Sequence, residues 1–133
     1  MGASDAVDMV VTAARAARQQ AIAPYSNFLV GAALELPDGR IVTGCNIENA
    51  SYGLTVCAER VALLKALSEG HRVFTRLAVV ADTAEATSPC GPCRQLLWEY
   101  CGDIPVIMAN LSTVKATYQL AALFPLPFDK RNL

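Results

Sequence analysis

The sequence has no long hydrophobic run, no excess of one charge and few charged residues in total. Eleven Lys and Arg residues against twelve Asp and Glu residues leave a formal net charge of −1, and charged residues make up only 17% of the chain. A protein that neutralises many phosphates needs a basic face, so this balance argues against nucleic acid as a partner. No apolar segment approaches the roughly 18 residues of a membrane span, so we expect no membrane partner either.

The chain also lacks the features of disordered, fibrous and exported proteins. Its 53% hydrophobic content excludes disorder, and its scattered Gly and Pro residues exclude collagen and coiled coils. Acidic residues stand where a signal peptide would carry basic ones, and five cysteines are an odd number for a secreted disulfide framework. We therefore expect a cytoplasmic protein with one domain over residues 1–133, in which grouped cysteines bind metal or do chemistry.

The hydrophobic periodicity and the turn residues predict an α/β fold. Two of the expected helices begin at caps, Ser4 and Thr55, and the second has an apolar face of Val61, Leu63, Leu64 and Leu67. Taken in order, the pattern predicts helices over residues 4–22, 56–69, 91–101 and 120–124, and strands over 28–36, 40–47, 77–81, 106–109 and 114–118. The expected architecture is a three-layer α-β-α sandwich with a five-stranded mixed sheet covered by helices.

Three cysteines stand at expected helix starts. Cys57 is near the start of the second long helix, and Cys90 and Cys93 are at the start of the third. Each of these helices follows a strand, so both N-termini should emerge at the same edge of the sheet. Positive helix ends lower thiol pKa values, and three sulfur ligands favour zinc. Three protein ligands leave a fourth position for water, as in catalytic zinc sites.

Two kinds of charged side chain accompany the cysteines. Glu59 is two residues beyond Cys57, which makes it a poor fourth ligand but a suitable proton acceptor for a nearby water. Zinc with three thiolates carries a net charge of −1, and Arg60 and Arg94 are spaced to offset it by donating hydrogen bonds to sulfur.

Other interpretations of these residues are open at this point. The Cys90/Cys93 pair also fits a redox pair or half of a structural zinc site, and Glu59 also fits an acidic residue that complements its helix dipole. Arg60 also fits a surface charge. Cys45 and Cys101 have no ligand partner by spacing and are expected to be buried structural thiols.

Four blocks of the sequence occur in a characteristic order: PYSNFLVGAA at 24–33, GCNIENASY at 44–52, CAE at 57–59 and SPCGPCRQ at 88–95. Together they resemble the small cytidine deaminases, in the three-cysteine form of the zinc deaminase signature, and the resemblance covers about residues 15–128.

This resemblance implies a zinc-dependent hydrolase that deaminates cytidine and 2′-deoxycytidine in pyrimidine salvage. Its zinc ligands match Cys57, Cys90 and Cys93, and its proton shuttle matches Glu59. In the substrate pocket, Phe28 matches a ring beside the base, and the Ala58 backbone matches a partner of the pyrimidine. Asn46 and Glu48 match the pair that holds the ribose 3′-hydroxyl. Arg60 matches the residue that hydrogen-bonds the thiolates.

The family is a homotetramer with shared active sites, and Tyr52 and Phe128 resemble side chains borrowed by a neighbouring subunit. The tail over residues 125–129 departs from the usual family ending, which has a small residue and Gly around that Phe. From the residues alone, Phe28 also fits a core position, and Asn46 and Glu48 also fit the start of a turn. Deaminases of polynucleotides or of other amino-substituted rings such as blasticidin S, and a non-enzymatic zinc-stabilised module, are the alternative functions.

Overall fold

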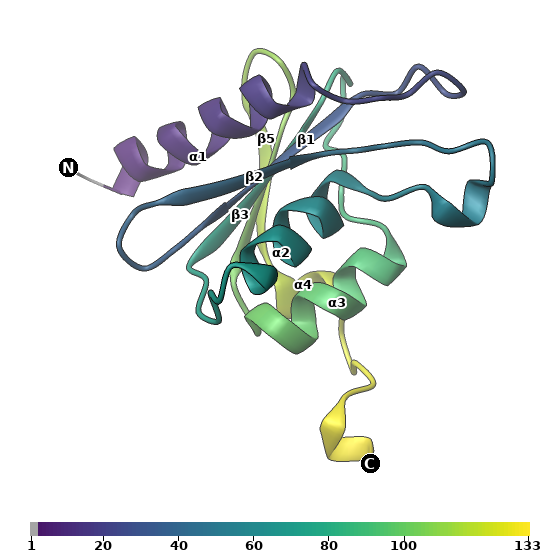
Figure 1. The fold of residues 1–133 in the computed structure, drawn as a ribbon. Helices are drawn as coiled ribbons and strands as arrows, with labels where there is room; N and C mark the ends of the chain where they lie inside the picture. The colour runs from purple at the N-terminus through teal and green to yellow at the C-terminus, as the bar shows by residue number, and fades with distance from the viewer. Residues whose placement is uncertain (1–2) are drawn as a thin grey trace.

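The computed structural model describes residues 3–133 and folds them around one five-stranded sheet (Figure 1). The helices are α1 (Ala3–Arg18), α2 (Ala58–Ser68), α3 (Gly91–Cys101) and α4 (Leu120–Leu123), with short 3₁₀ turns η1 (Tyr52–Leu54) and η2 (Lys130–Asn132). The strands are β1 (Val30–Glu35), β2 (Ile41–Cys45), β3 (Arg76–Ala81), β4 (Pro105–Ala109) and β5 (Val114–Gln119).

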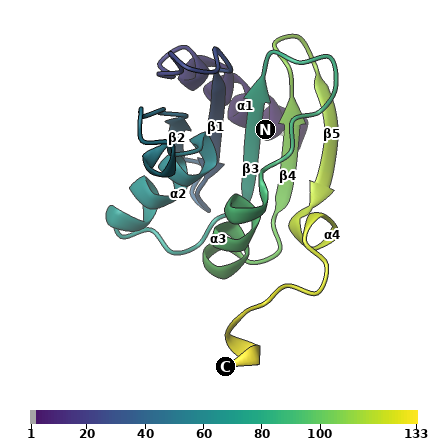
Figure 2. The same ribbon diagram turned by 90° about the vertical axis from the view of Figure 1, so that its right-hand side faces the viewer.

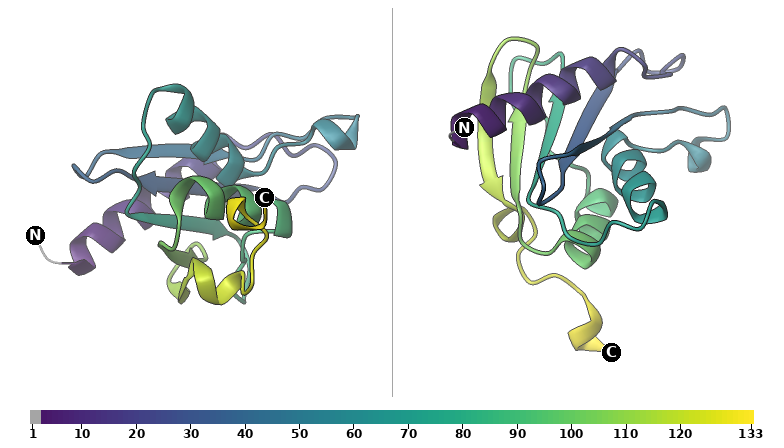
Figure 3. Two further views of the ribbon diagram at one scale, coloured as in Figure 1. Left: turned by 90° about the horizontal axis from the view of Figure 1, so that it is seen from below. Right: turned by 60° about the vertical axis from the view of Figure 1, so that its left-hand side comes forward.

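The sheet is mixed and lies between two layers of helices. Its strand order is β2-β1-β3-β4-β5; β3 and β4 run parallel, and the other neighbouring pairs are antiparallel. Helix α1 covers one face, and α2 and α3 cover the other (Figures 2 and 3). The predicted three-layer α-β-α sandwich is confirmed. Among residues 3–133, no helix has the length and apolarity needed to cross a membrane.

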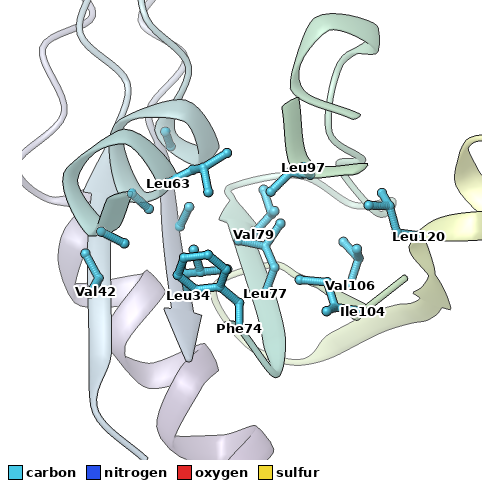
Figure 4. Close-up of a cluster of buried hydrophobic side chains, with 14 of the residues drawn as sticks. Leu34, Val42, Leu63, Phe74, Leu77, Val79, Leu97, Ile104, Val106 and Leu120 are labelled. Atoms are coloured by element: carbon cyan, nitrogen blue, oxygen red, sulfur yellow. The ribbon is translucent and has the colours of Figure 1, made fainter. Parts of the chain in front are cut away.

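Apolar side chains fill both spaces between the layers. The larger core lies under α2 and α3, where Leu34, Leu77 and Val79 of the sheet meet Leu63 and Leu97 of the helices (Figure 4). The smaller core lies under α1 and contains Val10, Val11 and Ala14 packed against Ala33, Ala78 and Val80. All but the first residue of β3 is buried, as its continuous apolar run predicts.

The helix boundaries differ from the sequence prediction. Ser4 lies inside α1, and the N-cap of α2 is Cys57 rather than Thr55. Helix α1 ends at Arg18, short of the predicted residue 22, because Ile22 forms an isolated bridge with Ile47, two residues beyond β2. The Ile22 N–H donates to the Asn46 carbonyl at 3.0 Å, and the Glu48 N–H donates to the Ile22 carbonyl at 2.8 Å.

The buried face of α2 consists of smaller side chains than predicted. Leu64 is 49% exposed, and the face toward the sheet is formed by Leu63 together with Ala58, Ala62 and Ala66. Small residues are needed because the helix lies directly on β2. A Cβ at Gly44 would stand 2.5 Å from the Ala58 carbonyl oxygen and 2.5 Å from the Ala62 nitrogen. This close approach brings the start of α2 to the end of β2.

Candidate active site

Three chain segments meet where β2 ends and α2 begins. Ile47 forms isolated bridges with Ile22 on one side and Val56 on the other. The Ile47 N–H donates to the Val56 carbonyl at 3.0 Å, and the Val56 N–H donates back to the Ile47 carbonyl at 2.9 Å. These bonds set Cys57, the next residue, beside Asn46 at the end of the sheet.

The three predicted cysteines form one cluster at two helix starts. Cys57 is the N-cap of α2, Cys90 is the N-cap of α3, and Cys93 lies buried in the first turn of α3. The three sulfur atoms all lie within 4.8 Å of one another. The prediction that both helix N-termini meet at one edge is confirmed.

The sulfur geometry fits a tetrahedral zinc site. Zn–S bonds of about 2.3 Å in tetrahedral geometry place two sulfurs about 3.8 Å apart. The Sγ atoms of Cys57 and Cys90 are 3.7 Å apart, and those of Cys90 and Cys93 are 3.3 Å apart. A hydrogen bond from Cys93 lowers the pKa of the Cys57 thiol below its ordinary value, and hydrogen bonds from Arg60 and Cys90 act in the same direction, which favours the thiolate that zinc requires. The cluster is therefore positioned to coordinate a zinc ion.

Glu59 is a buried acid next to this cluster. It is the second residue of α2 and only 5% exposed. Burial raises the pKa of its carboxyl to about 7, and the negative charge of Cys57 acts in the same direction. An acid in the first turn that served only the helix dipole would remain in solvent, where it keeps its hydration.

Arg60 and Arg94, both predicted to donate hydrogen bonds to the cysteine sulfurs, have different acceptors in the structure. Arg60 donates from Nη2 to the Cys57 sulfur at 3.8 Å and to the Thr55 carbonyl at 3.2 Å, as expected for a residue that hydrogen-bonds a thiolate. The prediction that Arg94 also reaches a sulfur is wrong. Its guanidinium donates to the carbonyl oxygens of Pro89 and Leu123 and to the Ser88 hydroxyl, which ties the start of α3 to α4.

A cleft of about 190 Å³ opens beside the cysteines. Of the predicted site residues, Phe28, Asn46, Cys57, Ala58, Glu59 and Cys90 line it. The sequence analysis missed the other six lining residues, Val30, Thr55, Val56, Val79, Thr87 and Ser88. Four of these six stand within three residues of a zinc-ligand candidate, and that proximity was the signal available in the sequence; Val30 and Val79 lie on strands and carry no such signal.

Asn46 holds the backbone that carries Phe28. Its Oδ1 accepts from the Val30 N–H at 2.8 Å, and its Nδ2 donates to the Phe28 carbonyl at 2.7 Å. The residue is buried, at 8% exposure. Its carboxamide has one further acceptor position and one further N–H, so it can also bind a ligand in the cleft. Phe28 is 42% exposed and therefore does not lie in the core.

Glu48 lies in an adjoining cavity rather than in the cleft that Asn46 lines. That cavity is formed with Tyr25, Ser26, Tyr52 and Thr55, and Thr55 lines both spaces. The side chain of Glu48 accepts hydrogen bonds from the Tyr25 and Ser26 backbones at 2.9 and 3.2 Å. Asn46 and Glu48 thus line two separate spaces that share Thr55 as a wall.

The two residues predicted to serve a neighbouring subunit are both exposed. Tyr52 lies in η1 with 75% exposure, and its ring contacts Tyr25 edge-on at a centroid distance of 6.0 Å. Phe128 is 60% exposed in the tail that extends away from the sheet (Figure 1). The tail is attached to α3 by two hydrogen bonds of 2.9 Å, from Gln95 Nε2 to the Phe128 carbonyl and from Trp98 Nε1 to Asp129 Oδ2.

Comparisons with known proteins agree on one family. Residues 4–109 match the model of the cytidine and deoxycytidylate deaminase zinc-binding region. The chain is 49% identical to the cytidine deaminase of Sporosarcina psychrophila over 96% of its length and 94% of that protein. It is 48% identical to the cytidine deaminase of Halalkalibacterium halodurans, with 94% and 96% of the two chains covered. The crystal structure of cytidine deaminase from Burkholderia pseudomallei superimposes with a TM-score of 0.88 at 45% identity, covering 91% of this chain and 98% of that one.

Proposed function

Because the chain belongs to the cytidine and deoxycytidylate deaminase family, we propose that it hydrolyses cytidine and 2′-deoxycytidine to uridine and 2′-deoxyuridine with release of ammonia. The observation that carries this proposal is the combination of a three-cysteine cluster and the buried Glu59 at one cleft. A structural zinc site or a redox pair has no use for a buried carboxylate beside its sulfurs.

When bound, a zinc ion would supply Lewis acidity and lower the pKa of a water to about 7. Cys57, Cys90 and Cys93 would hold it, and Arg60, which donates to the Cys57 sulfur, would offset part of their negative charge. Glu59 takes a proton from the water and delivers it to N3 of the cytosine ring as the water oxygen adds to C4. Glu59 then takes the second proton of that water from the oxygen now on C4 and delivers it to the amino group. The C4–N bond breaks, C4 becomes a carbonyl carbon, and ammonia leaves.

The remaining predicted residues hold the nucleoside in this proposal. Phe28 lies beside the base, and the backbone of Ala58 hydrogen-bonds the pyrimidine. Asn46 and Glu48 bind the ribose 3′-hydroxyl, and Glu48 makes the stronger contact because its acceptor is charged. A nucleotide chain continues from the 3′-oxygen, so this grip excludes a polynucleotide and leaves a free nucleoside as the substrate.

The proposed enzyme is a homotetramer in which Tyr52 and Phe128 reach a neighbouring active site. Support comes from exposed apolar side chains on the segments that also carry lining residues of the cleft and of its neighbouring cavity, where a monomer would leave them in water: Ile22, Tyr25, Ile47, Tyr52 and Leu54. A role in pyrimidine salvage and a cytoplasmic location complete the proposal, because thiolate ligands persist in a reducing compartment.

The decisive experiment follows the ultraviolet absorbance of cytidine after mixing with the purified protein. We expect loss of the cytidine band, loss of this activity on chelation and its return on addition of zinc. The same assay compares cytidine and 2′-deoxycytidine with free cytosine, blasticidin S and a short cytosine-containing oligonucleotide. Preference for the oligonucleotide or blasticidin S would overturn the nucleoside substrate, and absence of turnover on all five would overturn the deaminase.

A further inference from the structure

The turn at residues 25–28 donates several hydrogen bonds to the carboxylate of Glu48. Oε1 of Glu48 accepts from the backbone N–H of Tyr25 at 2.9 Å and from that of Ser26 at 3.2 Å. The Ser26 hydroxyl bonds to Oε2 of the same carboxylate. Asn27 completes the turn in the left-handed region, with φ of 57°.

The Ser26 hydroxyl also bonds to the residue that carries the aromatic ring of the cleft. Its Oγ accepts from the Phe28 N–H at 3.0 Å. A hydroxyl has a single proton, so Ser26 donates to Glu48 and accepts from Phe28. One side chain therefore connects the proposed sugar-binding carboxylate to the backbone of the proposed base-binding ring.

Few acceptor positions remain on Glu48 for a substrate. A carboxylate offers about four, two on each oxygen. Both positions on Oε1 are occupied by backbone N–H groups, and the Ser26 hydroxyl occupies one position on Oε2. The one position left is on the oxygen that Ser26 contacts. The direction of that position is set by where Ser26 holds the carboxylate.

We propose that Ser26 is a positioning residue for the sugar, whose hydroxyl orients Oε2 of Glu48 so that its remaining acceptor position faces the nucleoside 3′-hydroxyl. This inference rests on the proposed function and names a residue that works through Glu48 rather than on the substrate. The hydrogen bond from Ser26 is also the main cause that holds the pKa of Glu48 below its ordinary value, so the carboxylate is ionised when the sugar arrives.

The test measures kcat and KM of wild type, Ser26→Ala and Ser26→Thr with cytidine and with 3′-deoxycytidine. We expect Ser26→Ala to lower kcat/KM for cytidine about three- to tenfold through KM, the range of one hydrogen bond, and to change the value for 3′-deoxycytidine little. The preference for cytidine then falls by the same factor, and Ser26→Thr restores most of it. Ser68→Ala is the control, because that hydroxyl, like the one of Ser26, donates a hydrogen bond, here to the Lys65 carbonyl at 2.8 Å, and it lies at the far end of α2.

Each other outcome overturns the inference and does so for a different reason. An equal loss on both substrates assigns Ser26 only to the stability of the turn. A wild type that treats both substrates alike leaves the deaminase intact but removes the sugar contact of Glu48, and with it any role for Ser26. A wild type that turns over neither substrate overturns the proposed function itself. Melting temperatures of all variants show whether a loss of activity comes from unfolding.

Discussion

Glu48 and Glu59 carry the same functional group in opposite surroundings. Glu59 is 5% exposed, and burial raises its pKa to about 7. Glu48 is held by Ser26 and two backbone N–H groups, which keep its pKa below the ordinary value. One carboxyl is suited to exchange protons near neutral pH and the other to remain an acceptor. Divergence of two carboxyl pKa values within one site is typical of a division between proton transfer and binding.

Glu59→Gln tests the proton-transfer role. The substitution preserves size but replaces the carboxylate with an amide that cannot take up a proton near neutral pH. We expect turnover of cytidine to fall by at least about 10²–10⁴, the usual contribution of one general acid–base group. Metal analysis of the same preparation should still find about one zinc per chain, since Cys57, Cys90 and Cys93 are intact. Turnover within tenfold of wild type would contradict the role.

Cys101, which is not one of the site cysteines, makes the free energy of unfolding depend on pH. Burial raises the pKa of its thiol to about 12 from an ordinary value of 9.0. Below pH 9 the thiol is protonated in both states and contributes nothing. Between pH 9 and 12 the unfolded chain releases the proton and the folded one retains it, so the free energy of unfolding falls as pH rises, by up to about 1.4 kcal/mol per pH unit.

Denaturant unfolding at pH 8 and pH 10 checks this dependence. The loss of stability between the two pH values should be about 1 kcal/mol smaller in Cys101→Ala than in wild type, because other alkaline groups titrate equally in both. An identical loss in the two proteins would show that Cys101 ionises equally well folded and unfolded.

At the scale of elements, Gly44 sets how closely α2 lies on the sheet. Any side chain there would meet the backbone of the first turn of α2, which carries Ala58 and Glu59 next to Cys57. Gly31 has the same relation to α1, since a Cβ there would stand 2.0 Å from the Ala14 carbonyl oxygen and 2.6 Å from the Arg18 nitrogen. Helix α1 contributes no residue to the lining of the cleft.

Substitutions at these two glycines distinguish an effect on fold stability from an effect on the geometry of the site. Both Gly44→Ala and Gly31→Ala should lower the melting temperature, because a helix must move away from the sheet in each. Only Gly44→Ala moves the residues that do the chemistry, and we expect its kcat to fall about tenfold or more, since displacements approaching 1 Å cost on the order of 10²-fold. Measurement of kcat at a temperature where both variants are folded gives the answer. Equal kcat losses would assign Gly44 to stability alone.

The order of helices and strands could be predicted from the sequence because each element has its own periodicity and turn residues. The end of α1 and the start of α2 could not, since Ile22 and Val56 both pair with Ile47, outside their own local sequence. The same distinction holds in the site. Local spacing indicated the cysteine cluster, whereas the bonds from Asn46 and Glu48 to residues 25–30 span 16 to 23 positions and leave no local pattern.

For the whole molecule, the exposed apolar side chains around the cleft and along the tail predict self-association. Tyr52 is 75% exposed, Leu54 67% and Leu126 100%. Exposed apolar groups gathered near one site are typical of a surface that another chain covers.

Sedimentation analysis at micromolar concentration measures this assembly. We expect a homotetramer of about 57 kDa, four times the chain mass of 14.2 kDa. A species near 14 kDa that retains full activity would contradict the shared active site proposed for Tyr52 and Phe128. Phe128→Ala, which removes one borrowed ring, should raise KM without dissociating the tetramer.

Trp98 is the single tryptophan of the chain, and its indole N–H donates a hydrogen bond to Asp129 in the tail. The protein therefore has a built-in optical probe at the point where the tail joins α3. Release of the tail exposes this indole to water, and its emission should shift to longer wavelength. Fluorescence of Asp129→Asn, or of wild type titrated with substrate, then reports whether the tail is docked while the enzyme works, with no label attached.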